Sequence, residues 1–144
     1  MKKMIILILF SILTLRLTAP EVKELVILKS EPEYIYNVKD PFLRAVISYE
    51  SNYQERAVNP ITKARGILQI LPIIVREVNK YSENKYIWDD CFDPVKSIEI
   101  WDIIMQAKNP DYCYDRACRL WFGTGTQHDG KTWEDYYTEV MKLI

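Results

Sequence analysis

The sequence has few of the residues that metal and redox sites require. It contains one histidine, His128, and three cysteines that are not arranged in closely spaced pairs. Zinc sites in proteins are normally built from such pairs of cysteine and histidine ligands. We therefore expect no metal site and no cofactor.

The chain also lacks an excess of charge of either sign. Its 19 basic and 20 acidic residues give a net charge of -1, so no global attraction to nucleic acid is expected. At 144 residues, with 49% hydrophobic and 27% charged side chains, the composition is that of an ordinary globular protein. We expect one domain, without internal repeats and without extensive disorder.

The longest apolar run is shorter than a usual membrane span, which needs roughly 20 apolar residues. It is uninterrupted over residues 4–10, continues through Ile12, Leu13 and Leu15, and follows Lys2 and Lys3. Positive residues followed by a short apolar run are typical of an export signal. The alternative is that residues 4–15 form a buried helix of the domain, and the two lysines at the very start of the chain disfavour it.

The residues at the end of this segment do not decide whether a signal peptidase removes it. Residues 17–19, Leu-Thr-Ala, resemble the small-residue end of a cleavable signal, but Pro20 follows directly and disfavours cleavage there. Residues 1–19 are therefore predicted to be a signal peptide or an amino-terminal membrane anchor. Residues 20–144 are predicted to form one exported domain, in the periplasm or associated with the cell envelope.

Export makes the cysteines candidates for a disulfide. Cys113 and Cys118 lie five residues apart in a segment with helical periodicity, so a helix would separate their α-carbons by roughly 7.5 Å and point them to different sides. A bridge would thus join Cys91 to one of them, or link two chains. Three buried thiols acting as small hydrophobic side chains are an equal alternative.

The pattern of the rest of the chain predicts an all-α fold, because helix signals follow one another and strand-like alternation is scarce. Asp40-Pro41 and Asp93-Pro94 are typical helix starts, and Thr132 with Asp135 forms a capping box. The buried face of the fifth predicted helix would carry Cys113, Ala117, Leu120 and Trp121, with Gly123 and Gly125 at its end. Helices are expected at about 41–52, 64–71, 72–80 and 94–107. The fifth restarts after the break at residues 109–111, and the last holds Trp133, Tyr136, Tyr137 and Val140.

One carboxylate stands where an apolar residue is expected. In the predicted helix 41–52, Leu43, Val46 and Ile47 follow helical spacing, and the next position on that stripe is Glu50. Burial disfavours the charged form of a carboxylic acid and raises its pKa. Glu50 is therefore a candidate general acid, unless the helix end lets its side chain reach water.

The residues after Glu50 resemble a known catalytic signature. Glu50-Ser51, then Asn59-Pro60, then "ARGILQILP" over residues 64–72 is similar to the pattern of the lytic transglycosylases related to goose-type lysozyme, the SLT family. That pattern reads Glu-Ser, a polar loop with Ser-Pro or a similar pair, and Gly-Leu-Met-Gln-x-Met-Pro. Order and spacing agree except for one extra residue before Gly66.

The resemblance continues more weakly to about residue 126. Phe92-Asp93-Pro94 with Ile98 is similar to the family's Asp-Pro-x-x-Asn-Ile element, and residues 121–125 occupy the place of its Tyr-Asn-Ala-Gly. The resemblance implies a compact lysozyme-like helical domain. It also implies that peptidoglycan glycan strands are the substrate.

In the reaction that the resemblance implies, Glu50 is the single acid and base. It cleaves the β-1,4 bond between N-acetylmuramic acid and N-acetylglucosamine and forms a 1,6-anhydromuramic acid end. Glu55, Asp89, Asp90 and Asp93 are interpreted as loop or cap residues instead. The substrate-binding residues implied by the matched positions are Ser51, Asn59, Gly66, Gln69, Leu71 and Trp121.

One of these positions departs from the family. Trp121 stands where a tyrosine hydroxyl usually lies close to the acid, and an indole can donate a hydrogen bond but cannot accept one. We expect Tyr112, Tyr114 or a tyrosine of the last helix to replace the missing phenol. Trp121 itself would stack on a sugar ring or belong to the core.

Two other functions fit the same residues. A muramidase would cleave the same bond with water, and a degenerate protein would bind glycan as part of a cell-envelope assembly. Glu50 and Gln69 together favour an enzyme, because a pure binder does not need an acid on an apolar stripe. Partnership with secretion or other envelope machinery is compatible with either function.

Overall fold

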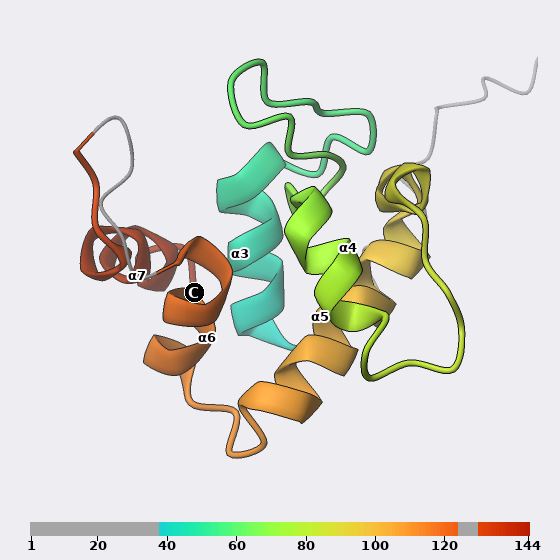
Figure 1. The fold of residues 1–144 in the computed structure, drawn as a ribbon. Helices are drawn as coiled ribbons and strands as arrows, with labels where there is room; N and C mark the ends of the chain where they lie inside the picture. The colour runs from blue at the N-terminus through green and yellow to red at the C-terminus, as the bar shows by residue number, and fades with distance from the viewer. Residues whose placement is uncertain (1–37, 124–129) are drawn as a thin grey trace, which may run out of the picture. The chain divides into compact units, whose positions relative to one another are not determined.

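The computed structural model describes residues 38–123 and 130–144 (Figure 1). The expected signal or anchor in residues 1–19 lies outside these ranges, as do Gly125 and His128. The chain divides into one unit of residues 1–30 and another of residues 31–144, and everything described below belongs to the second. Within the described ranges, no helix is long and apolar enough to cross a membrane.

The all-α class predicted from the sequence is confirmed for the described part of the chain. The α-helices there are joined by loops and one 3₁₀ helix, and the extended pairing is limited to two isolated β-bridges. The elements are α3 (Pro41–Ser51), α4 (Pro72–Val78), the 3₁₀ helix η1 (Trp88–Phe92), α5 (Pro94–Lys108), α6 (Tyr114–Phe122) and α7 (Trp133–Met141).

Three predicted helix starts are confirmed by their hydrogen bonds. The carboxylate of Asp40 accepts from the backbone N–H of Phe42 at 2.9 Å, and Asp93 caps α5 in the same way. At α7, Thr132 and Asp135 cap each other's backbone N–H groups. These side chains satisfy donors that the first turn of a helix leaves without partners.

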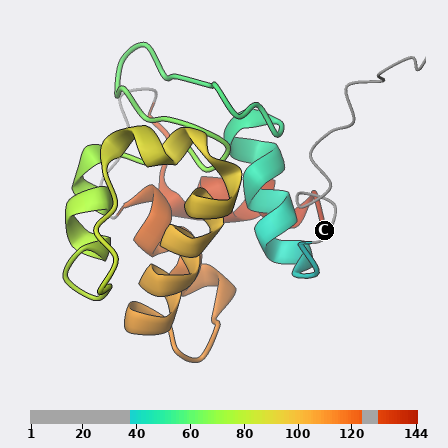
Figure 2. The same cartoon turned by 90° about the vertical axis from the view of Figure 1, so that its right-hand side faces the viewer.

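Helix α3 occupies a central position. In Figure 1 it lies between α6 and α7 on one side and α4 and α5 on the other, and Figure 2 shows the loop after α3 crossing its carboxyl end. α3 packs against α7, α6 packs against α7, and α4 packs against α5. The fully buried side chains of this core include Val46, Ile47, Ile67, Leu68, Ile70, Val78, Ile100, Met105, Tyr136 and Val140.

The prediction of a short helix at residues 64–71 is wrong. This segment is a tight turn in which Arg65 and Ile70 exchange backbone hydrogen bonds of 3.1 and 2.9 Å. Gly66 has a φ of 75° and Gln69 a φ of 48°, both in the left-handed region, which a right-handed helix does not allow. A short buried apolar run looks the same in a helix and in such a turn, so periodicity could not separate them.

Glycine is required at position 66 because the backbone of η1 lies very close to it. A Cβ at this position would stand 1.7 Å from the backbone oxygen of Cys91, which belongs to η1. That oxygen also accepts a 2.8 Å hydrogen bond from the buried hydroxyl of Ser97 on α5. The turn, η1 and α5 are thus packed together at one point, through a residue without a side chain.

The three cysteines, all within the described ranges, are unpaired. Cys91 and Cys118 are buried, whereas Cys113 is exposed. The expectation that Cys113 lies on the buried face of a helix is wrong, because its backbone is extended (φ -76°, ψ 118°) and α6 begins only at Tyr114. Ala117 on that face is buried, while Leu120 and Trp121 are half-buried.

Candidate active site

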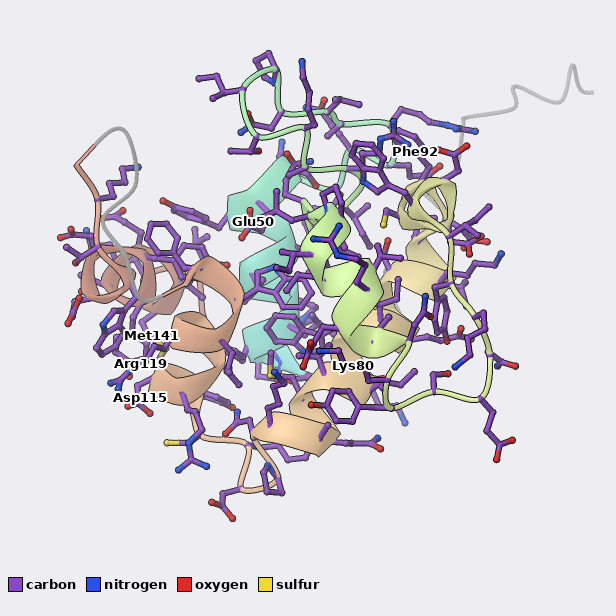
Figure 3. The ribbon with its side chains drawn as sticks, in the orientation of Figure 1. Glu50, Lys80, Phe92, Asp115, Arg119 and Met141 are labelled. Atoms are coloured by element: carbon purple, nitrogen blue, oxygen red, sulfur yellow. The ribbon has the colours of Figure 1, made fainter. Side chains whose placement is uncertain are left out.

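Glu50 lies in the last turn of α3 (Figure 3). The helix ends there because Asn52 adopts a left-handed conformation with φ 50° and ψ 47°. Leu43, Val46 and Ile47 of the same stripe are buried, and Glu50 itself is half-buried. The apolar stripe therefore begins in the core and ends at Glu50, where the protein interior meets solvent.

The carboxyl of Glu50 has one hydrogen-bond partner among the described side chains. The hydroxyl of Tyr136 donates to Glu50 Oε1 at 2.7 Å. Burial raises the pKa of Glu50 from 4.5 to about 7, and the Tyr136 hydrogen bond opposes this by stabilising the carboxylate. Although part of the residue touches solvent, desolvation controls its titration, as the apolar stripe predicted.

Tyr136 is buried beside the acid and packed between aromatic rings. It is 1% exposed, the ring of Tyr49 meets it edge-on at 4.9 Å, and the ring of Phe122 lies 5.0 Å away. Burial, followed by the charge of Glu50, raises the pKa of Tyr136 well above its usual value. The phenol therefore keeps its proton and acts as a donor to the carboxyl.

The sequence suggested Tyr112, Tyr114 or an unspecified tyrosine of the last helix as a replacement for the phenol absent at Trp121, and Tyr136 of that helix is the one that bonds to Glu50. The other two lie elsewhere. Tyr112 is 53% exposed, and Tyr114 stacks on Phe42 with the ring centroids 4.2 Å apart.

Glu50 opens into a cleft of about 240 Å³. Five of the predicted site residues line it: Glu50, Asn59, Gln69, Leu71 and Trp121. The described lining also contains residues that sequence analysis did not single out as site residues: Tyr49, Thr62, Ala64, Phe122 and Lys131. Tyr49 directly precedes the acid, and this adjacency is the one signal that could have found it.

Gln69 presents a single free hydrogen-bonding group to the cleft. Its amide nitrogen donates to the backbone oxygen of Gly66 at 2.9 Å and more distantly to that of Ala57 at 3.4 Å. The amide oxygen is left to accept a hydrogen bond from a ligand. The resemblance suggested that Gln69 both donates and accepts, whereas this geometry leaves it an acceptor.

Asn59 shows the opposite arrangement. Its side-chain oxygen accepts from the backbone N–H groups of Ile61 and Thr62 at 2.9 and 3.0 Å, which stabilises the loop after α3. The amide nitrogen is the group available for a ligand. Asn59 and Gln69 thus offer a donor and an acceptor on the same cleft.

Ser51 and Gly66 are not among the residues that line the cleft. The hydroxyl of Ser51 donates to the backbone oxygen of Ile67 at 2.9 Å, so it ties the end of α3 to the 65–70 turn. Gly66 approaches Cys91 rather than an open surface. Both residues position the turn that carries Gln69.

Trp121 takes part in the packing of the core and also lines the cleft. Its indole N–H donates to the backbone oxygen of Leu68 at 3.0 Å, and its ring contacts Trp101 edge-on at 4.6 Å, so it is part of the packing. It also lines the cleft. Because its only donor is already used, Trp121 can contact a ligand through its ring alone.

Three of the acids interpreted as loop or cap residues, Asp89, Asp90 and Asp93, are engaged outside the cleft, the first two within η1. Asp89 pairs with Arg65, and Asp90 pairs with Lys96 at 2.6 Å. Asp93 caps α5. A larger hollow of about 470 Å³ between the start of α3 and α5 does not include Glu50. We assign the site to the smaller cleft because it contains the carboxyl whose pKa is raised to about 7.

Comparisons with curated proteins and with solved structures found no match. A comparison with family models found one, the transglycosylase SLT domain, over residues 28–116. The matched residues include α3 with Glu50, the 65–70 turn and α5, whereas α7 with Tyr136 lies beyond them. The match covers more than half of the chain, so the protein belongs to the SLT transglycosylase domain family, a family of peptidoglycan-active domains.

Proposed function

We propose that this protein is a lytic transglycosylase. It cleaves the β-1,4 bond between N-acetylmuramic acid and N-acetylglucosamine and leaves a 1,6-anhydromuramic acid end. The observation that supports this most directly is that Glu50 is the one carboxylic acid in the described lining of the cleft, with a pKa of about 7. Most hydrolytic glycosidases need two carboxyl groups, whereas transfer to a hydroxyl of the same sugar needs one.

In the first step, protonated Glu50 gives its proton to the glycosidic oxygen. The bond from that oxygen to the anomeric carbon of the muramic acid breaks, and the oxygen of the 2-acetamido group attacks this carbon to form a cyclic oxazolinium. The N-acetylglucosamine end leaves with the proton. A pKa near 7 suits this step, because a large fraction of the acid is protonated near neutral pH.

In the second step, the Glu50 carboxylate takes the proton of the 6-hydroxyl on the same muramic acid. The 6-oxygen attacks the anomeric carbon, and the bond to the acetamido oxygen breaks. Glu50 regains its proton, and no water is consumed. Tyr136, donating to Oε1, stabilises the carboxylate between the two steps.

The test compares the full-length chain with Glu50→Gln on peptidoglycan sacculi, with soluble products weighed by mass spectrometry. We expect products lighter by the mass of one water than hydrolysed fragments, and a rate about 10²–10⁴ times lower in the variant.

Products with reducing ends would indicate a muramidase instead. Binding of sacculi without release at several pH values would indicate a glycan-binding protein and would overturn the assignment of an enzyme.

A further inference from the structure

The cleft around Glu50 contains a single cation in its described lining. Lys131 and Glu50 are the residues there that can carry a full charge near neutral pH, and the others are uncharged or aromatic. Because burial raises the pKa of Glu50 to about 7, the acid is largely uncharged below neutrality. Under those conditions the charge in the described lining is that of Lys131. The carboxylate of Asp135 lies outside this lining, and hydrogen bonds from Thr132, followed by the nearby charge of Lys131, lower its pKa.

Lys131 contacts Tyr49, a residue of α3 that also lines the cleft. Its Nζ donates to the hydroxyl of Tyr49 at 3.3 Å and lies 5.8 Å from the centre of that ring. Tyr49 immediately precedes the acid and packs on Tyr136. These contacts keep the ammonium group at the cleft while the residue remains exposed to solvent.

The pKa of Glu50 is raised by burial and lowered by the Tyr136 hydrogen bond. Lys131 lines the same cleft as the acid, and its ammonium group is therefore placed to contact a ligand there.

The chemistry of the glycan identifies the group that a cation can bind. The repeating sugars are uncharged except at the lactyl ether of the muramic acid, which ends in a carboxylate or continues into a carboxylate-bearing peptide. We propose that Lys131 determines substrate preference by binding a carboxylate on this muramyl substituent. The inference rests on the proposed function, because it requires a muramyl sugar in the cleft.

The test measures the binding of defined glycan strands by the full-length chain carrying Glu50→Gln, which prevents turnover. Lys131→Met and Lys131→Arg are compared on that background, with Lys142→Met as the control. Lys142 is an exposed lysine of the same region that pairs with Glu139 and does not line the cleft. The strands carry peptides, or free lactyl carboxylates, or lactyl groups amidated to remove the charge.

We expect Lys131→Met to weaken the binding of carboxylate-bearing strands about three- to tenfold at low salt, with a smaller loss at high salt. Lys131→Arg should bind nearly as the parent does, Lys142→Met should bind as the parent, and the amidated strands should not distinguish the variants. A loss confined to peptide-bearing strands would assign the carboxylate to the peptide, and a loss confined to bare strands would assign it to the lactyl group.

Equal weakening on amidated strands, or no weakening on any strand, would overturn the role of Lys131. These outcomes are separate from failure of the proposed function, which would appear as the absence of anhydro products from the unmodified chain. Matching unfolding curves of the lysine variants exclude a folding defect as the cause of weaker binding.

Discussion

Glu50 combines two opposing effects on one carboxyl group. Burial favours its protonated form, while the Tyr136 hydroxyl at 2.7 Å favours the carboxylate. An acid that must first give up a proton and then take one back needs both forms to be accessible. The resulting pKa of about 7 meets that requirement close to neutral pH.

We predict that Glu50→Gln stabilises the protein at high pH. A pKa raised from 4.5 to about 7 means that the folded state binds this proton more tightly than the unfolded chain does. The stability that the proton contributes is complete below about pH 4.5 and is lost as the pH rises to about 7, a loss of about 3 kcal/mol. The variant should therefore gain up to this amount over the parent between about pH 4 and pH 8, measured by urea unfolding.

A gain that is the same at both pH values would contradict the raised pKa. It would indicate that Glu50 ionises in the folded state as it does in the unfolded chain.

We predict that Tyr136→Phe moves the pH dependence of activity upward. The hydrogen bond from Tyr136 lowers the pKa of Glu50, so its removal should raise that pKa further. The alkaline limb of the rate profile should then shift to higher pH. The maximal rate should fall about ten- to a hundredfold, because the carboxylate loses a charge-assisted hydrogen bond.

Tyr137→Phe is the matched control for this variant. Tyr137 is the next residue of α7 and does not line the cleft. It should leave the profile unchanged. An unshifted profile for Tyr136→Phe would mean that Tyr136 serves packing alone.

At the scale of elements, the 65–70 turn connects the packing of the fold to the site. The Ser51 hydroxyl and the Trp121 indole each donate to a backbone oxygen of this turn, at 2.9 and 3.0 Å. On one side Gly66 lies against η1, and on the other Gln69 reaches the cleft. The turn is thus held by contacts with α3, α6 and η1, and it places the side chain of Gln69 in the cleft.

We predict that Gly66→Ala is severely destabilising, by more than about 3 kcal/mol. The new Cβ would lie 1.7 Å from the Cys91 oxygen, and this backbone atom cannot move without displacing η1. Gly123→Ala is the control, because Gly123 also has a positive φ of 97° but no atom of the residues that the structure describes lies within 4 Å of its Cβ position. It should cost only the backbone strain of its unusual φ and ψ (97° and 168°), about 1–3 kcal/mol.

Thermal or urea unfolding of both glycine variants measures this difference. Equal losses would mean that the positive φ, and not the contact with η1, makes glycine necessary at position 66.

At the scale of the whole molecule, the core protects two of the three thiols. Burial raises the pKa of Cys91 to about 11 and that of Cys118 to about 12, whereas Cys113 is exposed in front of α6. Both burial and a raised pKa slow reaction with thiol reagents, because the thiolate is the reactive form.

We predict that a disulfide-exchange reagent labels one thiol per chain in the folded protein, and all three after denaturation without reductant. Cys113→Ser should abolish the rapid labelling, and Cys91→Ser should leave it unchanged. Fewer than three thiols in the denatured chain would show that a disulfide is present.

Much of the helical framework could be predicted from local signals. The caps at Asp40, Asp93 and Thr132 are short-range patterns, and they are found where the sequence placed them. The 65–70 turn and the exposure of Cys113 could not be predicted in this way. The turn depends on two left-handed residues and on its contact with η1, more than twenty residues away in sequence.

The sequence by itself determined the helical class, the position of Glu50 on an apolar stripe and the family signature around it, because each is written in spacings of a few residues. Only the tertiary structure decided which tyrosine contacts the acid, since Tyr136 follows Glu50 by 86 residues and meets it through the packing of α7 on α3. It also decided that the amide oxygen of Gln69 and the amide nitrogen of Asn59 are the groups left for a ligand, and that Lys131 lines the cleft. Those roles depend on which atoms the folded chain has already used, and local sequence does not record that.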